Sequence, residues 1–261
     1  MTYQERIRIF DSQSEAYKQA FQIFLDHTDQ KRNASQWLQT MVESLPVRNV
    51  FIDAGAGNGE LTQAFAGAFT RTIAIEPNVY LREQLNRRLP NAETIGQSIL
   101  AAQPAAQGDL VLCSHTLYYI PPEAWLANLE CLVSWMAPTG VTIIVLQHRE
   151  SGCMNMVHHF FDHRFELRRT ADAFHAKHGD RYEVVTRRDS AHVQIPDLGK
   201  AYAVAEFMLN ILDIEYAPAR QAVEAYLQAH FAAEDGGYRI PVDQDFLQIR
   251  YRQGYESGQD R

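Results

Sequence analysis

One stretch limits the fold of this chain more than any other: residues 50–61 read VFIDAGAGNGEL. An apolar run ends in Asp53, three glycines follow at alternate positions, and a helix-like run begins at Glu60. This order predicts a buried parallel strand, a tight turn and the start of a helix. Glycine lets the backbone bend sharply and approach a ligand, and a helix N-terminus adds unpaired N–H groups. The stretch therefore predicts a ligand-binding turn.

A second apolar run, residues 72–75, ends in Glu76. That carboxylate follows the glycines by about twenty residues, where a doubly wound fold places the acid that binds a ribose diol. Glycines after a strand, together with an acid at the end of the next strand, are a stronger signal than glycines alone.

The spacing argues against two familiar nucleotide sites. No Gly-Lys-Ser/Thr occurs, which excludes a phosphate-cradling P-loop. The glycines read G-x-G-x-G rather than the dinucleotide pattern G-x-G-x-x-G, and Asp53 would repel a pyrophosphate at short range. Both observations weigh against an NAD-dependent oxidoreductase, and an acid at position 53 suits a ligand with a cationic end.

The two motifs resemble those of class I S-adenosylmethionine-dependent methyltransferases, D-x-G-x-G-x-G and an acid at the end of the second strand. The resemblance implies S-adenosyl-L-methionine as cofactor and S-adenosyl-L-homocysteine as product. It also implies that a loop after the third strand contacts the adenine. The cofactor-binding residues implied here are Asp53, Gly55, Ala56, Gly57, Gly59, Glu76, Pro77, Ser98, Ile99 and Ser114.

Length and composition narrow the class of protein. The 261 residues fit one large domain or a domain with a cap, and 46% apolar residues allow a sizeable core. A net charge of −8 disfavours nucleic-acid and membrane-surface partners. Three scattered cysteines, no signal-peptide pattern and no apolar stretch long enough for a bilayer favour a cytoplasmic protein, which we expect to be a monomer or homodimer.

The order of the predicted elements indicates an α/β fold. Apolar runs and turns predict strands at 50–53, 72–75, 93–100, 109–114 and 141–146, with a turn at 138–140 and helices at 60–69, 79–89 and 123–136. Strands that alternate with helices through short turns predict a parallel, doubly wound sheet. The resemblance extends this to a Rossmann-like sheet of seven strands with an antiparallel C-terminal strand, for which Gln194 and residues 245–251 are candidates.

Both ends of the chain carry additions to this unit. Residues 1–46 have a helical pattern, with Asp11 or Ser12 as the first cap and Asn33 as the second. Helices that precede the first strand lie over the sheet, either as a lid on the site or as core packing. The methyltransferase domain is expected at 47–252, with insertions at about 148–180 and 197–240 and a polar tail at 253–261. We expect helices at 201–212 and 218–233, and strands at 181–185 and 192–194.

The end of the fourth strand supplies the candidate catalytic residues. In open α/β sheets the ligand crevice lies at the carboxyl ends of the strands, so His115, Tyr118 and Tyr119 are expected to face it. Imidazole titrates near pH 6.5 and can take the proton of an amine acceptor. Tyrosine faces attract a sulfonium or a cationic product.

Residues 10–150 further resemble the histamine N-methyltransferase-like group, through Y-x-x-x-F-x-x-F-L-x-H at 17–27, IEP at 75–77 and LYY at 117–119. The acceptor-binding residues that this resemblance implies are Tyr17, Phe21, Gln30, His115, Tyr118, Tyr119, Phe160 and Asp243. Gln244 is the alternative to Asp243 for the C-terminal acceptor-binding residue. The pocket glutamate of that group falls at or next to Gln30, and its glutamine falls near His115. We therefore expect another amine, an imidazole or a peptide-like natural product rather than histamine.

The stretch 147–178 is rich in histidine, and His159 and His163 are four residues apart. No H-E-x-x-H and no carboxylate–histidine cluster of suitable spacing accompanies them. We expect no metal site, and solvated surface or pocket lining is the better interpretation.

The sequence thus predicts a methyltransferase that moves a methyl group to a nitrogen, or an oxygen, of a small molecule by in-line SN2 transfer. The alternatives are an O-methyltransferase of a natural product and a non-catalytic S-adenosylmethionine-binding regulatory module. An RNA methyltransferase usually needs a basic face, which the acidic balance disfavours.

Overall fold

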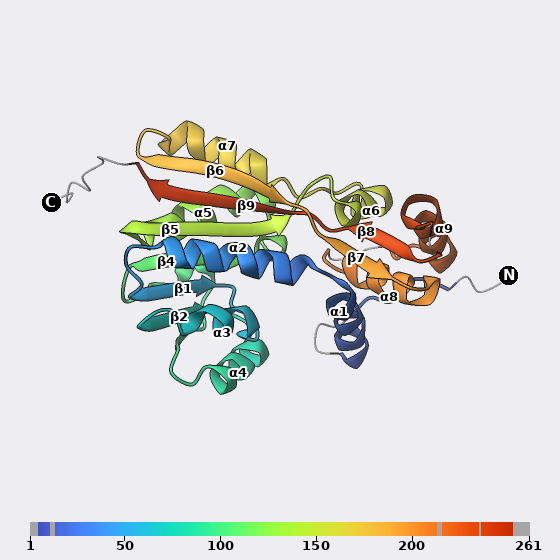
Figure 1. Ribbon diagram of the computed structural model, residues 1–261, viewed down its shortest axis with the longest axis horizontal. Coiled ribbons are helices and arrows are strands. Elements are labelled where there is room, and N and C mark those ends of the chain that lie inside the picture. The colour runs from blue at the N-terminus through green and yellow to red at the C-terminus, as the bar shows by residue number, and fades with distance from the viewer. Residues whose placement is uncertain (1–4, 11–13, 213–215, 235, 253–261) are drawn as a thin grey trace. The chain divides into compact units, whose positions relative to one another are not determined.

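The computed structural model describes residues 5–10, 14–212, 216–234 and 236–252. The chain forms two compact units (Figure 1). The sheet unit comprises residues 36–146, 166–187 and the chain from 245 onward, and the helical unit comprises residues 1–35, 147–165 and 188–244. The predicted tail at 253–261 and the predicted caps Asp11 and Ser12 lie outside the described residues.

The sheet unit contains a seven-stranded sheet in the order β3-β2-β1-β4-β5-β9-β6. Neighbours from β3 to β5 pair in parallel, and β9 runs opposite to β5 and β6 (Figure 1). The predicted fold class, a mostly parallel Rossmann-like sheet with an antiparallel strand, is confirmed. The strands are β1 (Val50–Ala54), β2 (Arg71–Ile75), β3 (Glu93–Ile95), β4 (Gly108–Ser114), β5 (Met136–Gln147), β6 (Tyr182–Asp189) and β9 (Gln244–Tyr251).

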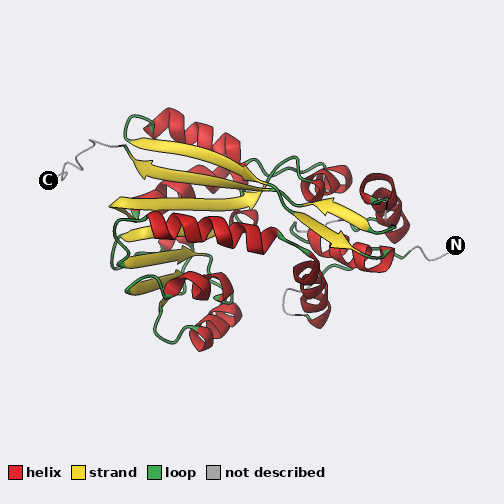
Figure 2. Ribbon diagram, viewed as in Figure 1, coloured by secondary structure: helices red, strands yellow, loops and turns green. Residues whose placement is uncertain are grey.

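Helices cover both faces of this sheet, and Figure 2 shows α2 in front of the strands and α5 behind them. Covering both faces explains why the central strands read as continuous apolar runs rather than as alternating patterns. In α5 the buried face includes Trp125, Leu129 and Leu132. The helices are α2 (Gln30–Ser44, of which 36–44 belongs here), α3 (Glu60–Ala66), α4 (Val79–Arg88), α5 (Trp125–Ser134) and α7 (Leu167–His178), with short 3-10 turns η1 (Ile99–Ala101), η2 (Leu117–Tyr119) and η3 (Pro122–Ala124).

Three local predictions about the strands were wrong. The strand predicted at 93–100 ends at Ile95, and residues 99–101 form the 3-10 turn η1 instead. The predicted turn at 138–140 lies inside β5, because the register with β4 jumps from Gly108↔Met136 to Leu110↔Val141 and the strand continues through the irregularity. Gln194 lies in the short strand β7 (His192–Ile195), which pairs with β8 (Tyr238–Pro241) in a separate two-stranded sheet. The strand beside β9 in the large sheet is β6, whose eight residues match the length of β9.

The helical unit is built from α1 (Glu15–His27), α6 (Gly152–Phe161), α8 (Leu198–Leu209), α9 (Arg220–Phe231) and the β7–β8 pair. Helix α1 packs on α8, and α8 packs on α9. The side chain of Ser14 caps α1 by accepting the Tyr17 N–H at 3.1 Å. The predicted cap Asn33 is wrong, since α2 begins three residues earlier, where Thr28 Oγ1 accepts the Gln30 N–H at 3.1 Å.

The helical pattern predicted over residues 1–46 does not extend to residues 5–10. This segment is extended, with an antiparallel bridge between Arg6 and Ala219. Its backbone hydrogen bonds go to a distant part of the chain, which a pattern read along the sequence cannot anticipate. None of the described helices combines the length and apolar character needed to span a bilayer.

Candidate functional site

The glycine turn lies between β1 and α3, at the carboxyl ends of the parallel strands. Gly55, Gly57 and Gly59 all have positive φ, at 79°, 56° and 79°. The N–H groups of Gly55 and Ala56 both donate to the carbonyl oxygen of Ile75, at 2.8 and 3.0 Å. The turn is therefore fastened to the end of β2, next to Glu76.

Gly55 touches a side chain that the sequence motif did not include. A Cβ at this position would lie 2.0 Å from Thr116 Oγ1. Thr116 in turn donates to the carbonyl oxygens of Ala54 and Ser114, at 3.3 and 3.2 Å, and so joins the ends of β1 and β4. No local pattern marks Thr116, because its role depends on a contact between two strands that are distant in sequence.

Gly57 faces open space instead. A Cβ there would meet no atom within 4 Å, and the backbone N–H donates to Glu76 Oε2 at 2.9 Å. An exposed backbone with no side chain above it is the surface that a ligand can approach closely. This geometry fits a nucleoside cofactor at the turn.

The Glu76 carboxylate is buried and each oxygen already accepts one backbone N–H. Gly57 N–H donates to Oε2 at 2.9 Å, and Asn78 N–H donates to Oε1 at 2.8 Å. A carboxylate offers about four acceptor sites, so each oxygen can accept one more donor, such as a ribose hydroxyl. Arg82 of α4 holds the loop by donating to the carbonyl oxygens of Glu76 and Pro77, at 2.7 and 2.9 Å. Sequence reasoning also missed Arg82.

Asp53 lies in β1 below the turn and is almost fully buried. Its Oδ2 accepts a hydrogen bond from Thr62 Oγ1 of α3 at 2.6 Å. Burial raises the pKa of Asp53 to about 7, the Thr62 bond opposes that shift, and the charge of Glu76 adds to it. The carboxyl is therefore about half ionised at neutral pH, and a nearby positive charge would favour its ionised form.

His115 adopts a left-handed backbone, with φ of 55°, directly after β4. Its N–H donates to the carbonyl oxygen of Val145 at 2.9 Å, which holds the strained residue in place. Strained residues of this kind gather at functional sites. Its ring lies stacked near that of Tyr118, with centroids 5.9 Å apart and Nδ1 3.3 Å from the Tyr118 hydroxyl oxygen. Tyr119 is 75% exposed.

The remaining predicted cofactor residues occupy the same edge of the sheet unit. Ser98 is exposed immediately before η1, whereas the side chain of Ile99 is buried and its carbonyl accepts the Cys131 thiol at 3.3 Å. Ile99 therefore offers backbone rather than side chain to a ligand. Ser114 is half-buried at the end of β4, and Pro77 is exposed.

In the helical unit, the predicted acceptor residues Tyr17 and Phe21 stack on one face of α1, with centroids 6.2 Å apart. Phe207 of α8 contacts both rings, at 5.6 and 5.2 Å, and also Phe24 at 5.5 Å. Tyr17 and Phe21 are half-buried, so this aromatic cluster presents a partly open face. Sequence reasoning found the α1 rings by their helical spacing and missed Phe207.

Gln30 and Asp243 lie in a buried polar cluster of the helical unit. Gln30 Nε2 donates to the carbonyl oxygen of Val242 at 2.8 Å and lies 3.1 Å from the Gln147 amide. Asp243 forms an ion pair with Arg188 at 2.5 Å, and its other oxygen accepts the Ala191 N–H at 3.2 Å. Both predicted acceptor-binding side chains are thus engaged with the protein itself.

Phe160 of α6 packs against Tyr226 of α9 at 5.6 Å, and His159 contacts the same ring at 4.7 Å. Helix α6 ends at Phe161, and Asp162 adopts a left-handed backbone, so His159 and His163 do not share a helical face. Within the described ranges, no group of three or more His, Cys, Asp or Glu side chains is arranged to hold a metal ion.

Comparisons with known proteins identify the family of the chain and agree with its fold. The profile of a family described as "Methyltransferase domain" matches residues 25–194, more than half of the chain. The fold is similar to that of YcgJ from Bacillus subtilis, with TM-score 0.61 and 14% identity over 83% of this chain and 98% of that one. The N-methyltransferase NodS from Bradyrhizobium japonicum, solved with S-adenosyl-L-homocysteine, gives TM-score 0.56 and 13% identity over 92% and 100%. No protein of curated function matches the sequence.

The glycine geometry predicts a graded series of stabilities. Gly55→Ala should lower the unfolding free energy by roughly 2–5 kcal/mol, because it adds a steric clash with Thr116 to the cost of a left-handed backbone. In Gly57→Ala the added Cβ meets no atom, so only the left-handed backbone should lower the unfolding free energy, by about 1–2 kcal/mol. Gly67→Ala, at φ −66° with open space, is the control and should change stability by less than about 0.5 kcal/mol. Urea denaturation measures all three, and equal losses for Gly55 and Gly67 would contradict the contact.

The raised pKa of Asp53 predicts how the stability of the protein depends on pH. Its raised pKa means that the folded state binds more protons than the unfolded state between about pH 4 and pH 7. Its contribution to stability therefore falls as pH rises through that window, by on the order of 4 kcal/mol, and stays low above it. Asp53→Asn keeps an acceptor for Thr62, so its Tm relative to wild type should increase from pH 5 to pH 8. The exposed Asp172→Asn is the control, and parallel Tm curves for wild type and Asp53→Asn would refute the shift.

Proposed function

We propose that this chain, which belongs to the methyltransferase domain family, moves a methyl group from S-adenosyl-L-methionine to a nitrogen of a small molecule. The observation that carries the proposal is the bond between the Gly57 N–H and the Glu76 carboxylate, with open space above Gly57. It combines an approachable backbone with a carboxylate that retains acceptor capacity.

The residues at the turn fit the parts of this cofactor. Glu76 has acceptor sites for the two ribose hydroxyls. The open backbone at Gly57 admits the chain that carries the methyl group. Asp53 titrates near neutral pH, so a cationic ligand at the turn would draw it into its charged form. We assign the adenine contact to Ser98 and to the backbone of Ile99.

The cofactor, when bound, supplies a methyl group already activated on a sulfonium, so positioning the acceptor does most of the catalytic work. An amine must be neutral to attack. We assign His115 as the base that takes its proton at Nε2. For this role Nδ1 carries the ring proton and donates to the Tyr118 hydroxyl, which leaves the lone pair on Nε2. The ring is held for this by Tyr118 and by the left-handed backbone.

Aromatic side chains supply the proposed acceptor face. Tyr118 and the exposed Tyr119 follow His115 in η2, and their rings can attract a cationic product. For the helical unit taken by itself, the family resemblance implies Tyr17, Phe21 and Phe160 as acceptor-binding residues. Gln30 and Asp243 already bind protein groups of the helical unit, so we do not assign them to the acceptor.

Two alternatives are separated by one assay. Tyramine carries both an amine and a phenol, so mass spectrometry of its product distinguishes N- from O-methylation. A non-catalytic binding module would bind S-adenosylhomocysteine and methylate no member of an amine and phenol panel. The His115–Tyr118 pair beside the turn favours an enzyme over such a module. All three cysteines carry free thiols, and we place the protein in a reducing compartment.

Glu76→Gln should weaken S-adenosylhomocysteine binding by about 2 kcal/mol, roughly thirtyfold, in calorimetric titration. The amide removes the charge and turns an NH₂ group toward either the Gly57 or the Asn78 N–H. Glu93→Gln is the matched control, since Glu93 is exposed on β3 and pairs with Arg71. Equal affinities of wild type and Glu76→Gln would remove Glu76 from the site.

His115→Asn should lower kcat about a hundredfold and leave S-adenosylhomocysteine affinity within about twofold. Asparagine tolerates the left-handed backbone, so the change removes the base with little strain. The pH profile of kcat should have an acid limb in the wild type, where an imidazole base becomes protonated, and this limb should be absent in the variant. Parallel losses in kcat and cofactor affinity would assign His115 to cofactor binding.

A further inference from the structure

Residues 5–10, here called the N-terminal strap, run extended along the helical unit. The Ile7 N–H donates to the carbonyl oxygen of Pro218 at 3.0 Å, and the Arg220 N–H donates to that of Glu5 at 2.8 Å. Ile7 is buried, whereas Ile9 is 63% exposed. Few side chains of the strap enter the core, so a strong polar contact with the helical unit can contribute much of what keeps the strap in place.

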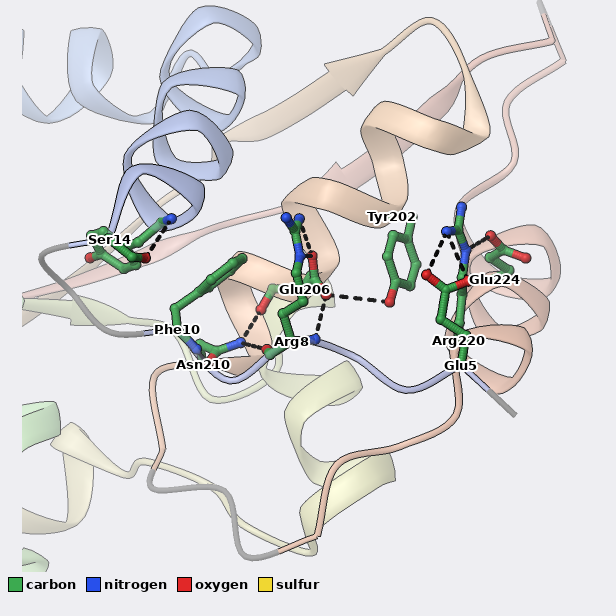
Figure 3. Close-up of polar contacts among 10 residues, drawn as sticks. Glu5, Arg8, Phe10, Ser14, Tyr202, Glu206, Asn210, Arg220 and Glu224 are labelled. Carbon is green, nitrogen blue, oxygen red and sulfur yellow. Dashed lines mark hydrogen bonds and ion pairs between the residues drawn. The ribbon is translucent and has the colours of Figure 1, made fainter. Parts of the chain in front are cut away.

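That contact is the carboxylate of Glu206 in α8, which is 1% exposed. Arg8 donates to it three times: Nη2 and Nε reach Oε2 at 2.6 and 2.8 Å, and the backbone N–H reaches Oε1 at 2.5 Å (Figure 3). Tyr202 also donates to Oε1, at 3.4 Å. Burying a carboxylate at this depth without a cationic partner costs folding free energy. The Arg8–Glu206 pair therefore holds the strap against α8.

The same turn of α8 holds the aromatic cluster. Phe207 follows Glu206 in sequence and packs on Tyr17 and Phe21. Asn210, one turn further on, accepts the Phe10 N–H at 2.8 Å and donates to the Arg8 carbonyl oxygen at 2.9 Å. The rings of Phe10 and Tyr17 pack edge to face, with their centroids 6.0 Å apart.

Arg8 therefore connects the buried carboxylate to the acceptor residues. Its guanidinium lies 5.2 Å from the centre of the Phe10 ring, which itself contacts Tyr17. Phe10 and Phe207 both contact the Tyr17 ring. Without the Arg8–Glu206 pair, the strap keeps the Phe10 bond to Asn210 but loses its strongest contact with α8.

We propose that Glu206 and Arg8 are positioning residues for the methyl acceptor. The ion pair keeps the strap closed and so fixes the Phe10–Tyr17–Phe207 face on which a small aromatic or cationic acceptor binds. This inference rests on the proposed function, which assigns Tyr17 and Phe21 to the acceptor. The strap also has backbone hydrogen bonds to Pro218 and Arg220, and the buried pair is its strongest side-chain contact. An acceptor that binds the closed face would favour closure.

The neighbouring ion pairs do not have this role. Arg220 pairs with Glu224 at 2.7 Å and with Glu5 at 3.3 Å (Figure 3), but its side chain is 37% exposed and that of Glu5 is 68% exposed. Solvated pairs of this kind contribute little. The Glu224 carboxylate therefore serves as a matched control, on the same unit and with an arginine partner.

The test is Glu206→Gln, with Glu224→Gln as control. Hydrogen exchange followed by mass spectrometry should show about tenfold faster exchange for the strap amides in Glu206→Gln and no change in the control. The KM for the best methylated member of a panel of tyramine, histamine and spermidine should rise about fivefold, with kcat and S-adenosylhomocysteine affinity within about twofold. Arg8→Ala should give the same pattern. Arg8→Lys should change strap exchange and KM less than Arg8→Ala does. The double variant Arg8→Ala/Glu206→Gln should be no worse than the poorer single variant.

Unchanged strap exchange in Glu206→Gln would overturn the proposal, as would a cofactor affinity that falls in parallel with acceptor affinity. If Glu206→Gln fails to fold, Arg8→Lys decides the question, because lysine keeps a cation beside the buried carboxylate but loses the paired guanidinium hydrogen bonds. Wild type that binds no S-adenosylhomocysteine would remove the proposed function and the acceptor role with it. The exchange data would still report whether Arg8 and Glu206 hold the strap, so the two failures are distinguishable.

Discussion

The hydrogen bond from the Gly57 N–H to the Glu76 carboxylate is the contact on which the site depends. It links the turn after β1 to the loop after β2, at 2.9 Å, and it is buried at the Glu76 side. Two parallel strands place these groups side by side because their carboxyl ends share one edge of the sheet. The carboxylate holds the turn with one lone pair on Oε2 and keeps others for a ligand.

Two carboxyl groups lie near this bond, and they differ in depth. Glu76 lies at the ligand edge, and Asp53 beneath it is buried, with its pKa raised to about 7. Burial is the main cause of this raised pKa, and repulsion between Asp53 and the charge of Glu76 adds to it. A cationic ligand at the turn would relieve that repulsion. The site is therefore suited to a ligand that combines a ribose with positive charge, and the same physics disfavours a pyrophosphate.

Much of this could be predicted from the sequence, because it is written in local patterns. Apolar runs of strand length marked β1, β2, β4 and β5, and the alternate glycines marked the turn. Other features depend on contacts between distant segments and leave no local signal. Thr116 matters only because β4 lies beside β1, Arg82 because α4 folds back on the Glu76 loop, and Arg8 because the strap meets α8. The short strand β8 and the pairing of β7 were missed for the same reason.

A crystal structure of the protein with S-adenosyl-L-homocysteine would test the assignment of the cofactor site directly. We expect both ribose hydroxyls within about 2.7 Å of the two Glu76 carboxylate oxygens, and the ligand chain passing over the Gly57 backbone. A ligand bound elsewhere, with Glu76 still bonded to protein groups alone, would contradict the assignment of this turn as the cofactor site.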